Sequence, residues 1–404
     1  MDHLPTIAAL DQLDQVPWDT LEHAYGDASD VPEMLRAIRH GDDEIRGEAI
    51  NGLLYSLDHQ GVQRFEATLH AIRYLVGIVA DPTAPGRGGL ARLLAEFAVG
   101  DTAWFLHDGF HPDLQAAPDD CARPQASSVI EGKGMIVRGF PSIGPGHDMT
   151  AGLGLREIYL AVVAGVPVYL SALTDGGAAD DEDLRASIPF LLAFCTPRAA
   201  EIAPALTALL DDASAAVRAS AALGLSHAVK FEAALRGPAL AVLGERFAAA
   251  TTDVERRCLA LALSRFEQPA DTAAARAALH AALIAGVPAA MPFEDFAWQR
   301  IDSPPFVFCE AFIGGDDDDH PATVAAGLAC LPQLTDTDDA ADLALWIARI
   351  ALPDPGEPLD DAARIAIATL ADAAPAWHFS DLGNLLADRG YPSVREEFAA
   401  VADA

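Results

Sequence analysis

A short pattern that recurs five times along the chain constrains its fold more than any other feature. Each copy begins with acidic or small polar residues, continues with an arginine and ends in an alanine-rich apolar stretch, as in "DDASAAVRASAALGL". This order is typical of a helix N-terminus, because side-chain oxygens cap the first free N–H groups and carboxylates favour the positive end of the helix dipole. The five arginines, which we expect to pair with acids of neighbouring repeats, are Arg46, Arg185, Arg218, Arg256 and Arg364.

The spacing of these copies predicts stacked pairs of helices. Arg185, Arg218 and Arg256 follow one another at steps of 33 and 38 residues, and helix-pair repeats have periods of roughly 34 to 47 residues. Elsewhere apolar residues recur every three or four positions, as over residues 31–38 and 45–57, which is the helical period. One stretch, "AVVAGVPVYLSAL", fits either a strand or two helices joined at "AGVP". We therefore predict an all-α protein.

The kernels D-x-x-V-R-x-x-A, clearest in "DDASAAVRASAALGL" and "DDEIRGEAINGL", resemble those of HEAT repeats. The whole chain is similar to a family of bacterial HEAT-repeat proteins of the PBS-lyase HEAT-like type. The resemblance is good over residues 16–80 and 155–265 and rests on "WDTLEHAYGDASDVPEMLRAI", "HQGVQRFEATLHAIRYLVGIVAD", "AVVAGVPVYLSALTD", "LRASIPFLLAF" and the terminal "LGNLLADRGYPSVREEF". It implies a right-handed α-α superhelix, a HEAT-like solenoid. Some members of such families accompany polymorphic toxin systems as immunity or accessory proteins.

We expect one solenoid over residues 1–404, interrupted by two irregular insertions. Residues 81–154 hold 12 of the 31 glycines and seven prolines, in stretches such as "GRGG" that oppose regular helix. Residues 291–322, rich in aromatic and acidic side chains, form the second insertion. The remaining parts are an N-terminal cap with the first repeats over 1–80, central repeats over 155–290, and C-terminal repeats with a cap over 323–404.

The stretch "WDTLEHAYG" near the N-terminus has two interpretations. Trp, His and Tyr side chains this close together occur in active sites. Trp18, Leu21 and Tyr25 also lie at i, i+3 and i+7, which is one face of a helix. Because a terminal repeat must cover its exposed apolar side, we interpret these three residues as the N-terminal cap of the array.

The charge balance bears on the partners of the protein. Sixty acidic residues face 26 basic ones, for a formal charge of −34. Such a surface repels phosphate backbones, so we expect no nucleic-acid partner, and it attracts basic proteins. A salty cytoplasm or a GC-rich genome produces the same composition, which is a second explanation. No run reaches the roughly 18 apolar residues of a membrane span, and the start "MDHLPTIAALDQLD" lacks the basic region of a secretory signal. We therefore expect a cytoplasmic protein without a membrane partner.

Residues 291–322 supply the candidate binding site. Their aromatic side chains either pack on the solenoid or present a patch to a partner. The candidate partner-binding residues are Phe293, Phe296, Trp298, Phe306, Phe308, Asp316, Asp317, Asp318 and Asp319.

The motifs of common enzymes are missing from the sequence. "EGKGM" lacks the Ser or Thr of a phosphate-binding loop, and "GGDDDDH" lacks the alternating spacing of an EF-hand. The five cysteines show no paired spacing and are expected to be buried free thiols. We therefore expect no catalytic residue, no cofactor and no metal ligand.

These observations predict a protein-binding scaffold, in its most specific form an immunity-type inhibitor of a basic toxin such as a nuclease. The alternative is a general scaffold or accessory protein whose acidity reflects its habitat. A further alternative is a HEAT-like enzyme, either a lyase or a relative of DNA glycosylases. The binding face and the oligomeric state stay open.

Overall fold

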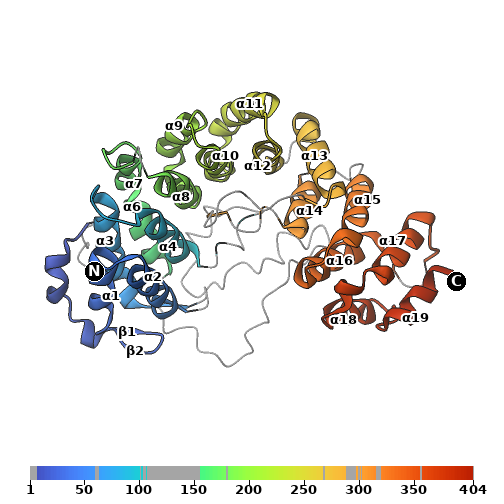
Figure 1. Ribbon diagram of the computed structural model, residues 1–404, viewed down its shortest axis with the longest axis horizontal. Helices are drawn as coiled ribbons and strands as arrows, with labels where there is room; N and C mark the ends of the chain where they lie inside the picture. The colour runs from blue at the N-terminus through green and yellow to red at the C-terminus, as the bar shows by residue number, and fades with distance from the viewer. Residues whose placement is uncertain are drawn as a thin grey trace. The chain divides into compact units, whose positions relative to one another are not determined.

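The computed structural model describes residues 7–403 except 60–62, 101, 103–105, 107–154, 179–180, 267–268, 288–296, 299–300, 302, 315–319 and 355–356. The described chain is predominantly helical, and its strands are confined to two hairpins of two-residue strands, which confirms the predicted all-α class. The chain divides into two compact units (Figure 1). The first runs from α1 (Val31–His40) to α11 (Ala233–Ala249) and also includes Ala297 and Trp298, and the second runs from α12 (Asp253–Ser264) to α19 (Arg395–Ala399). No helix in the described ranges is long and apolar enough to span a membrane.

Alternate helices of the first unit form two rows. The helices between its ends are α2 (Asp43–Leu57), α3 (Glu66–Ala80), α4 (Arg87–Val99), α6 (Leu155–Ala164), α7 (Val166–Ala172), α8 (Glu182–Ala193), α9 (Ala199–Leu209) and α10 (Ala215–Val229). In one row α2 packs on α4, α4 on α8 and α8 on α10; in the other α1 packs on α3, α3 on α7 and α7 on α9. The two rows contact each other, as α1 does α2 and α9 does α10. The ambiguous "AVVAGVPVYLSAL" belongs to α6 and α7, which meet at Gly165, so the two-helix alternative is correct.

The second unit repeats this alternation. Its inner members are α13 (Pro269–Ile284), α14 (Pro304–Ile313), α15 (His320–Cys330), α16 (Thr337–Ala351), α17 (Asp361–Asp372) and α18 (Asp381–Asp388). α12 packs on α14, α14 on α16 and α16 on α18, while α13 packs on α15, α15 on α17 and α17 on α19. Consecutive helices from α12 to α17 also contact each other, so these helices are held both by their pair and by their row.

Two segments that we expected to be irregular contain helices. The stretch "GRGG" leads into α4, and "PPFVFCEAFI" is α14. Proline is compatible with the first helical positions, where its missing N–H has no partner within the helix, so Pro304 and Pro305 begin α14 instead of breaking it. Gly88 lets α8 approach α4, because a Cβ there would overlap the carboxylate of Asp183. Most of the predicted insertion, residues 107–154, lies outside the described residues.

The stretch "WDTLEHAYG" is a 3₁₀ turn and a hairpin, not the helix that we expected. The chain reverses between β1 (Glu22–His23) and β2 (Gly26–Asp27), which pair antiparallel. Trp18 and Leu21 are buried as predicted, and the Trp18 ring packs edge-on against His70. The prediction for Tyr25 is wrong: it lies at the turn of the hairpin and is 66% exposed. A second hairpin joins β3 (Asp58–His59) to β4 (Gln63–Arg64).

Candidate functional site

Each of the five recurring arginines occupies the same position in its helix. It is the fourth residue after the N-cap, and the N-cap side chain accepts a hydrogen bond from the backbone N–H of the third residue. The predicted capping by acidic and small polar residues is therefore confirmed in α2, α8, α10, α12 and α17. The five N-caps are Asp42, Asp181, Ser214, Thr252 and Asp360.

Four of the five guanidinium groups donate to carbonyls of the loop that precedes their helix, whereas Arg364 donates to the Ala402 carbonyl. Nη1 of Arg218 donates to the carbonyl oxygens of Asp212 and Ala213 at 2.9 and 3.0 Å, and Nη2 of Arg256 donates to that of Ala250 at 2.9 Å. The carbonyl groups of Asp212, Ala213 and Ala250 precede the N-caps and lie outside the helix ladder, so the arginine supplies each of them with a hydrogen-bond donor. At these two positions the arginine binds backbone, a partner that we did not predict.

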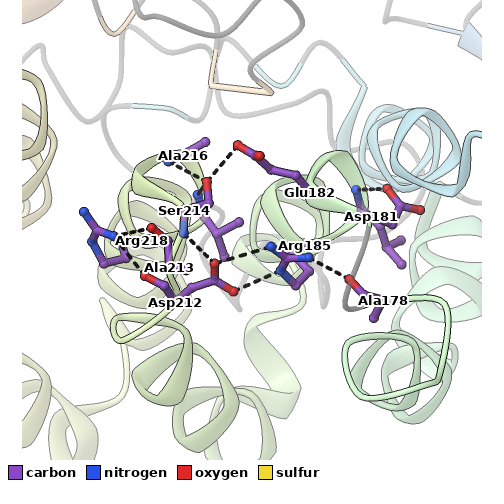
Figure 2. Close-up of polar contacts among 11 residues, drawn as sticks. Ala178, Asp181, Glu182, Arg185, Asp212, Ala213, Ser214, Ala216 and Arg218 are labelled. Carbon is purple, nitrogen blue, oxygen red and sulfur yellow. Dashed lines mark hydrogen bonds and ion pairs between the residues drawn. The ribbon is translucent and has the colours of Figure 1, made fainter.

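Arg185 also bridges two repeats (Figure 2). Its Nε and Nη2 donate to Oδ2 and Oδ1 of Asp212 at 2.9 and 3.4 Å, and its Nη1 donates to the Ala178 carbonyl at 2.7 Å. Asp212 lies in the loop before α10, where its Oδ1 also accepts the Ser214 N–H at 2.8 Å. The predicted pairing with an acid of the neighbouring repeat is confirmed here. We name this cluster of Arg185, Asp212 and Ser214 the α8–α10 junction.

Two other loops of the first unit carry a similar arrangement. Asp175, before α8, accepts two guanidinium hydrogen bonds from Arg87 at 2.5 and 3.2 Å. Asp81, before α4, accepts two from Arg39 at 3.1 and 2.8 Å and one from the Thr83 hydroxyl at 2.7 Å. The Arg87 guanidinium holds the pKa of Asp175 below its ordinary value, and the Thr83 hydroxyl is the main cause of the same shift in the pKa of Asp81. Both aspartates therefore stay charged at neutral pH.

The chemistry of the α8–α10 junction suits a structural contact. The Ser214 Oγ donates to Oε1 of Glu182 at 2.8 Å and accepts the N–H groups of Ala216 and Val217 at 3.1 and 3.4 Å. Both acceptor contacts are helix-capping hydrogen bonds. They occupy the oxygen lone pairs with which a nucleophilic hydroxyl would attack a substrate. The junction fixes α8 against α10 and provides no activated nucleophile of its own.

The structure buries three of the predicted partner-binding residues. Trp298 is 1% exposed, and Phe306 and Phe308 lie in the core on α14. These three side chains do not form an exposed aromatic patch, so the packing alternative is correct for them, as expected for large apolar groups that gain by leaving water. The other predicted residues lie outside the described residues: Phe293, Phe296, Asp316, Asp317, Asp318 and Asp319.

Trp298 fills an aromatic cage in the first unit. Its ring meets Phe190 of α8 edge-on at 5.1 Å and His227 of α10 at 5.4 Å. Its indole Nε1 donates to the Ser220 hydroxyl at 2.8 Å, and that hydroxyl donates to the Ala186 carbonyl at 2.5 Å. The Trp298 indole therefore contacts both α8 and α10, close to the hydrogen bonds of Arg185. In the sequence Trp298 lies far from these two helices.

Two of the described cysteines have thiols of low reactivity. Burial raises the pKa of the Cys195 thiol to about 12 and that of Cys330 to about 11. Because the thiolate is the reactive form, both groups are poor nucleophiles at neutral pH. The prediction of buried free thiols is confirmed for Cys195, Cys258, Cys309 and Cys330, while Cys121 lies outside the described residues.

Two exposed tyrosines in the first unit were missed by the sequence analysis. Tyr25 was assigned to the N-terminal cap, and Tyr55 of α2 was not considered; their side chains are 66% and 61% exposed. A signal for Tyr55 was present, because it continues the polar face of α2 that runs through Glu44, Glu48 and Asn51 at helical spacing. For Tyr25 no such signal exists, since the same spacing fits a helix and a turn.

Comparisons with known proteins give no family assignment. The chain matches no protein-family model, and no curated protein is significantly similar to it. The proposals below therefore rest on the residues and contacts described above.

Proposed function

We propose that the protein is a non-catalytic scaffold, a HEAT-like α-α solenoid, that binds a basic protein in the cytoplasm. The observation that carries this proposal is the alternating packing of its helices. In both units most helices pack on a neighbour in the chain and on a helix further along the same row, as α8 does on α10 and α14 on α16, which is how helix-pair repeats stack into a solenoid. Solenoids use their extended surfaces mainly to bind other macromolecules.

The distribution of charge supports a basic partner. The chain has 34 more acidic than basic residues, and part of its basic complement is used internally. Arg265, for example, is buried against Glu310, with Nε and Oε1 3.2 Å apart. Carboxylates therefore dominate the composition of the surface, and complementary charge accelerates the encounter with a cationic protein.

The most specific form of this proposal is an immunity-type inhibitor of a basic toxin, for instance a nuclease whose active-site cleft is cationic. Carboxylates covering such a cleft would exclude its polyanionic substrate. The resemblance to HEAT-repeat proteins of toxin systems supports this form, and a toxin gene beside the gene of this protein would support it further.

Affinity capture tests the proposal. The tagged protein is incubated with lysate of its source cells at about 0.05 M and about 0.5 M salt, where screening differs severalfold. We expect basic proteins that are retained at low salt, are released at high salt, and bind again when purified. Retained proteins that are acidic or neutral and indifferent to salt would contradict the basic partner and favour a general scaffold whose acidity reflects habitat.

A further inference from the structure

The six tyrosines of the chain, all of them described, fall into two groups. Four donate their hydroxyl to a backbone carbonyl at 2.8 to 3.1 Å, namely Tyr74, Tyr159, Tyr169 and Tyr391. The hydroxyls of Tyr25 and Tyr55 make no hydrogen bond to any residue that the structure describes, and both side chains are more than half exposed. The two tyrosines whose hydroxyls have no hydrogen-bond partner among the described residues are therefore also the exposed ones.

Both exposed tyrosines belong to one surface. The backbone N–H of Ala24 donates to the Ser56 carbonyl at 3.0 Å, which joins the turn of the β1–β2 hairpin to the end of α2. Tyr25 and Tyr55 are the chain neighbours of these two residues. We name the surface formed by Tyr25, Tyr55 and the hairpin carboxylates the tyrosine surface.

The Tyr25 ring is held in place. It meets His59 edge-on at 5.7 Å and His23 edge-on at 6.2 Å, and its backbone N–H donates to Nδ1 of His23 at 3.0 Å. The other nitrogen of His23, Nε2, is 2.9 Å from Oδ1 of Asp30. An exposed ring that is already oriented loses little conformational entropy when a ligand packs on it.

The hairpin carries two acidic residues at paired positions of its strands. Glu22 and Asp27 are directly opposite in the antiparallel register, and both are exposed. Like charges in this arrangement destabilise a hairpin, so hairpin stability does not explain them. Hydrogen bonds from Ser29 lower the pKa of Asp27, so it remains charged. A cationic group bound at this hairpin would be attracted by both residues.

The basic residues around this surface do not compensate for the acids. Residues 16–59 contain ten aspartates and glutamates and three arginines. Each arginine is paired with a carboxylate: Arg36 with Asp14, Arg39 with Asp81 and Arg46 with Asp43. A cationic ligand would therefore meet uncompensated negative charge.

We propose that the tyrosine surface binds an arginine-bearing segment of the basic partner. The planar guanidinium stacks on aromatic faces and pairs with carboxylates in two-bond geometry, and lysine does the first less well and cannot do the second. Tyr25 and Tyr55 provide the faces, and Glu22 and Asp27 provide the carboxylates. This inference rests on the proposed function, because it names the partner chemistry of that same scaffold.

Two labelled peptides, nona-arginine and nona-lysine, test the proposal by fluorescence anisotropy with the full chain. The double variant Tyr25→Ala/Tyr55→Ala should bind nona-arginine at least fivefold more weakly and leave nona-lysine binding within about twofold. Tyr25→Phe/Tyr55→Phe keeps the aromatic faces and should retain nona-arginine binding. Glu22→Gln/Asp27→Asn should weaken both peptides. The matched control is Phe379→Ala, which removes an exposed aromatic ring from the second unit.

A photo-reactive nona-arginine locates the contact. We expect its adducts, mapped by mass spectrometry, to concentrate on residues 22–27 and 51–59. Adducts spread over the chain, or equal effects of the tyrosine variant and Phe379→Ala, would overturn the inference.

Circular dichroism melting checks that the variants are folded, which the exposure of both tyrosines predicts. If the captured basic protein still binds these variants with wild-type affinity, the tyrosine surface is refuted and the proposed function stands; if no basic protein binds the wild type, the proposed function itself fails.

Discussion

The α8–α10 junction allows the stability contribution of a largely buried ion pair to be compared with that of an exposed one. Arg185→Ala removes two hydrogen bonds to Asp212 and one to the Ala178 carbonyl. The arginine and aspartate side chains are 14% and 13% exposed. Truncating one member of a fully buried ion pair costs about 3–5 kcal/mol, and residual solvation of this pair lowers the expected loss to about 2–3 kcal/mol.

The neighbouring loop residue provides a matched control. Asp211 pairs with Arg246 at 2.7 Å, but those side chains are 66% and 39% exposed. Exposed pairs contribute about 0.2–1 kcal/mol, so Arg246→Ala should cost less than about 1 kcal/mol. Arg185→Ala and Arg246→Ala each remove one positive charge that pairs with an aspartate of the same loop. The two variants differ in how deeply the pair is buried.

Urea denaturation followed by circular dichroism measures both variants, and a double-mutant cycle with Asp212→Ala isolates the pair. We expect a coupling energy of about 1–2 kcal/mol between Arg185 and Asp212. Hydrogen exchange by mass spectrometry should show the added opening in α8 and α10. Equal destabilisation by Arg185→Ala and Arg246→Ala, with no coupling to Asp212, would refute the interpretation of the junction as a connection between repeats.

Three further predictions concern buried groups of the first unit. Trp18→Ala should destabilise the protein by about 3–5 kcal/mol, because a buried aromatic side chain is lost; an unchanged melting temperature would contradict its role in the core. Trp298→Ala should cost a similar amount and Trp298→Phe about 1 kcal/mol, since the latter loses mainly the hydrogen bond to Ser220; equal costs in thermal denaturation would mean that the bond contributes most of the stability. Burial, aided by Arg73, lowers the pKa of His70 below its ordinary value of 6.5, so the unfolded chain binds a proton more readily and stability should fall as the pH drops through 6.5. His70→Gln should flatten the melting temperature between about pH 5 and pH 7 relative to wild type, and an unchanged pH profile would rule out this contribution.

The capping pattern could be predicted from the sequence because each of its parts acts locally. Asp181 caps the helix that Arg185 braces, and both residues lie within five positions of one another. The register of such a motif does not depend on the rest of the fold. The same reasoning identified all five kernels and with them the helical class.

The burial of three candidate partner-binding residues, Trp298, Phe306 and Phe308, could not be predicted because it depends on tertiary packing. Phe306 and Phe308 fall in the segment that we expected to be an irregular insertion, yet Pro304 and Pro305 occupy the first helical turn and begin α14 there. Gly88 was read as a breaker, although its missing Cβ permits the α4–α8 contact. The exposure of Tyr25 depends on a hairpin whose residues also fit a helical period.

The central claim is that the acidic scaffold captures a basic protein by charge, and stopped-flow association kinetics test it most directly. The purified partner from the capture experiment is mixed with the protein between about 0.01 M and 0.15 M salt, where the Debye length falls from about 30 to about 8 Å. Electrostatic steering predicts an association rate constant that drops at least tenfold over this range, while the dissociation rate changes far less. An association rate constant that varies by less than twofold would contradict the claim that charge brings the partner to this scaffold.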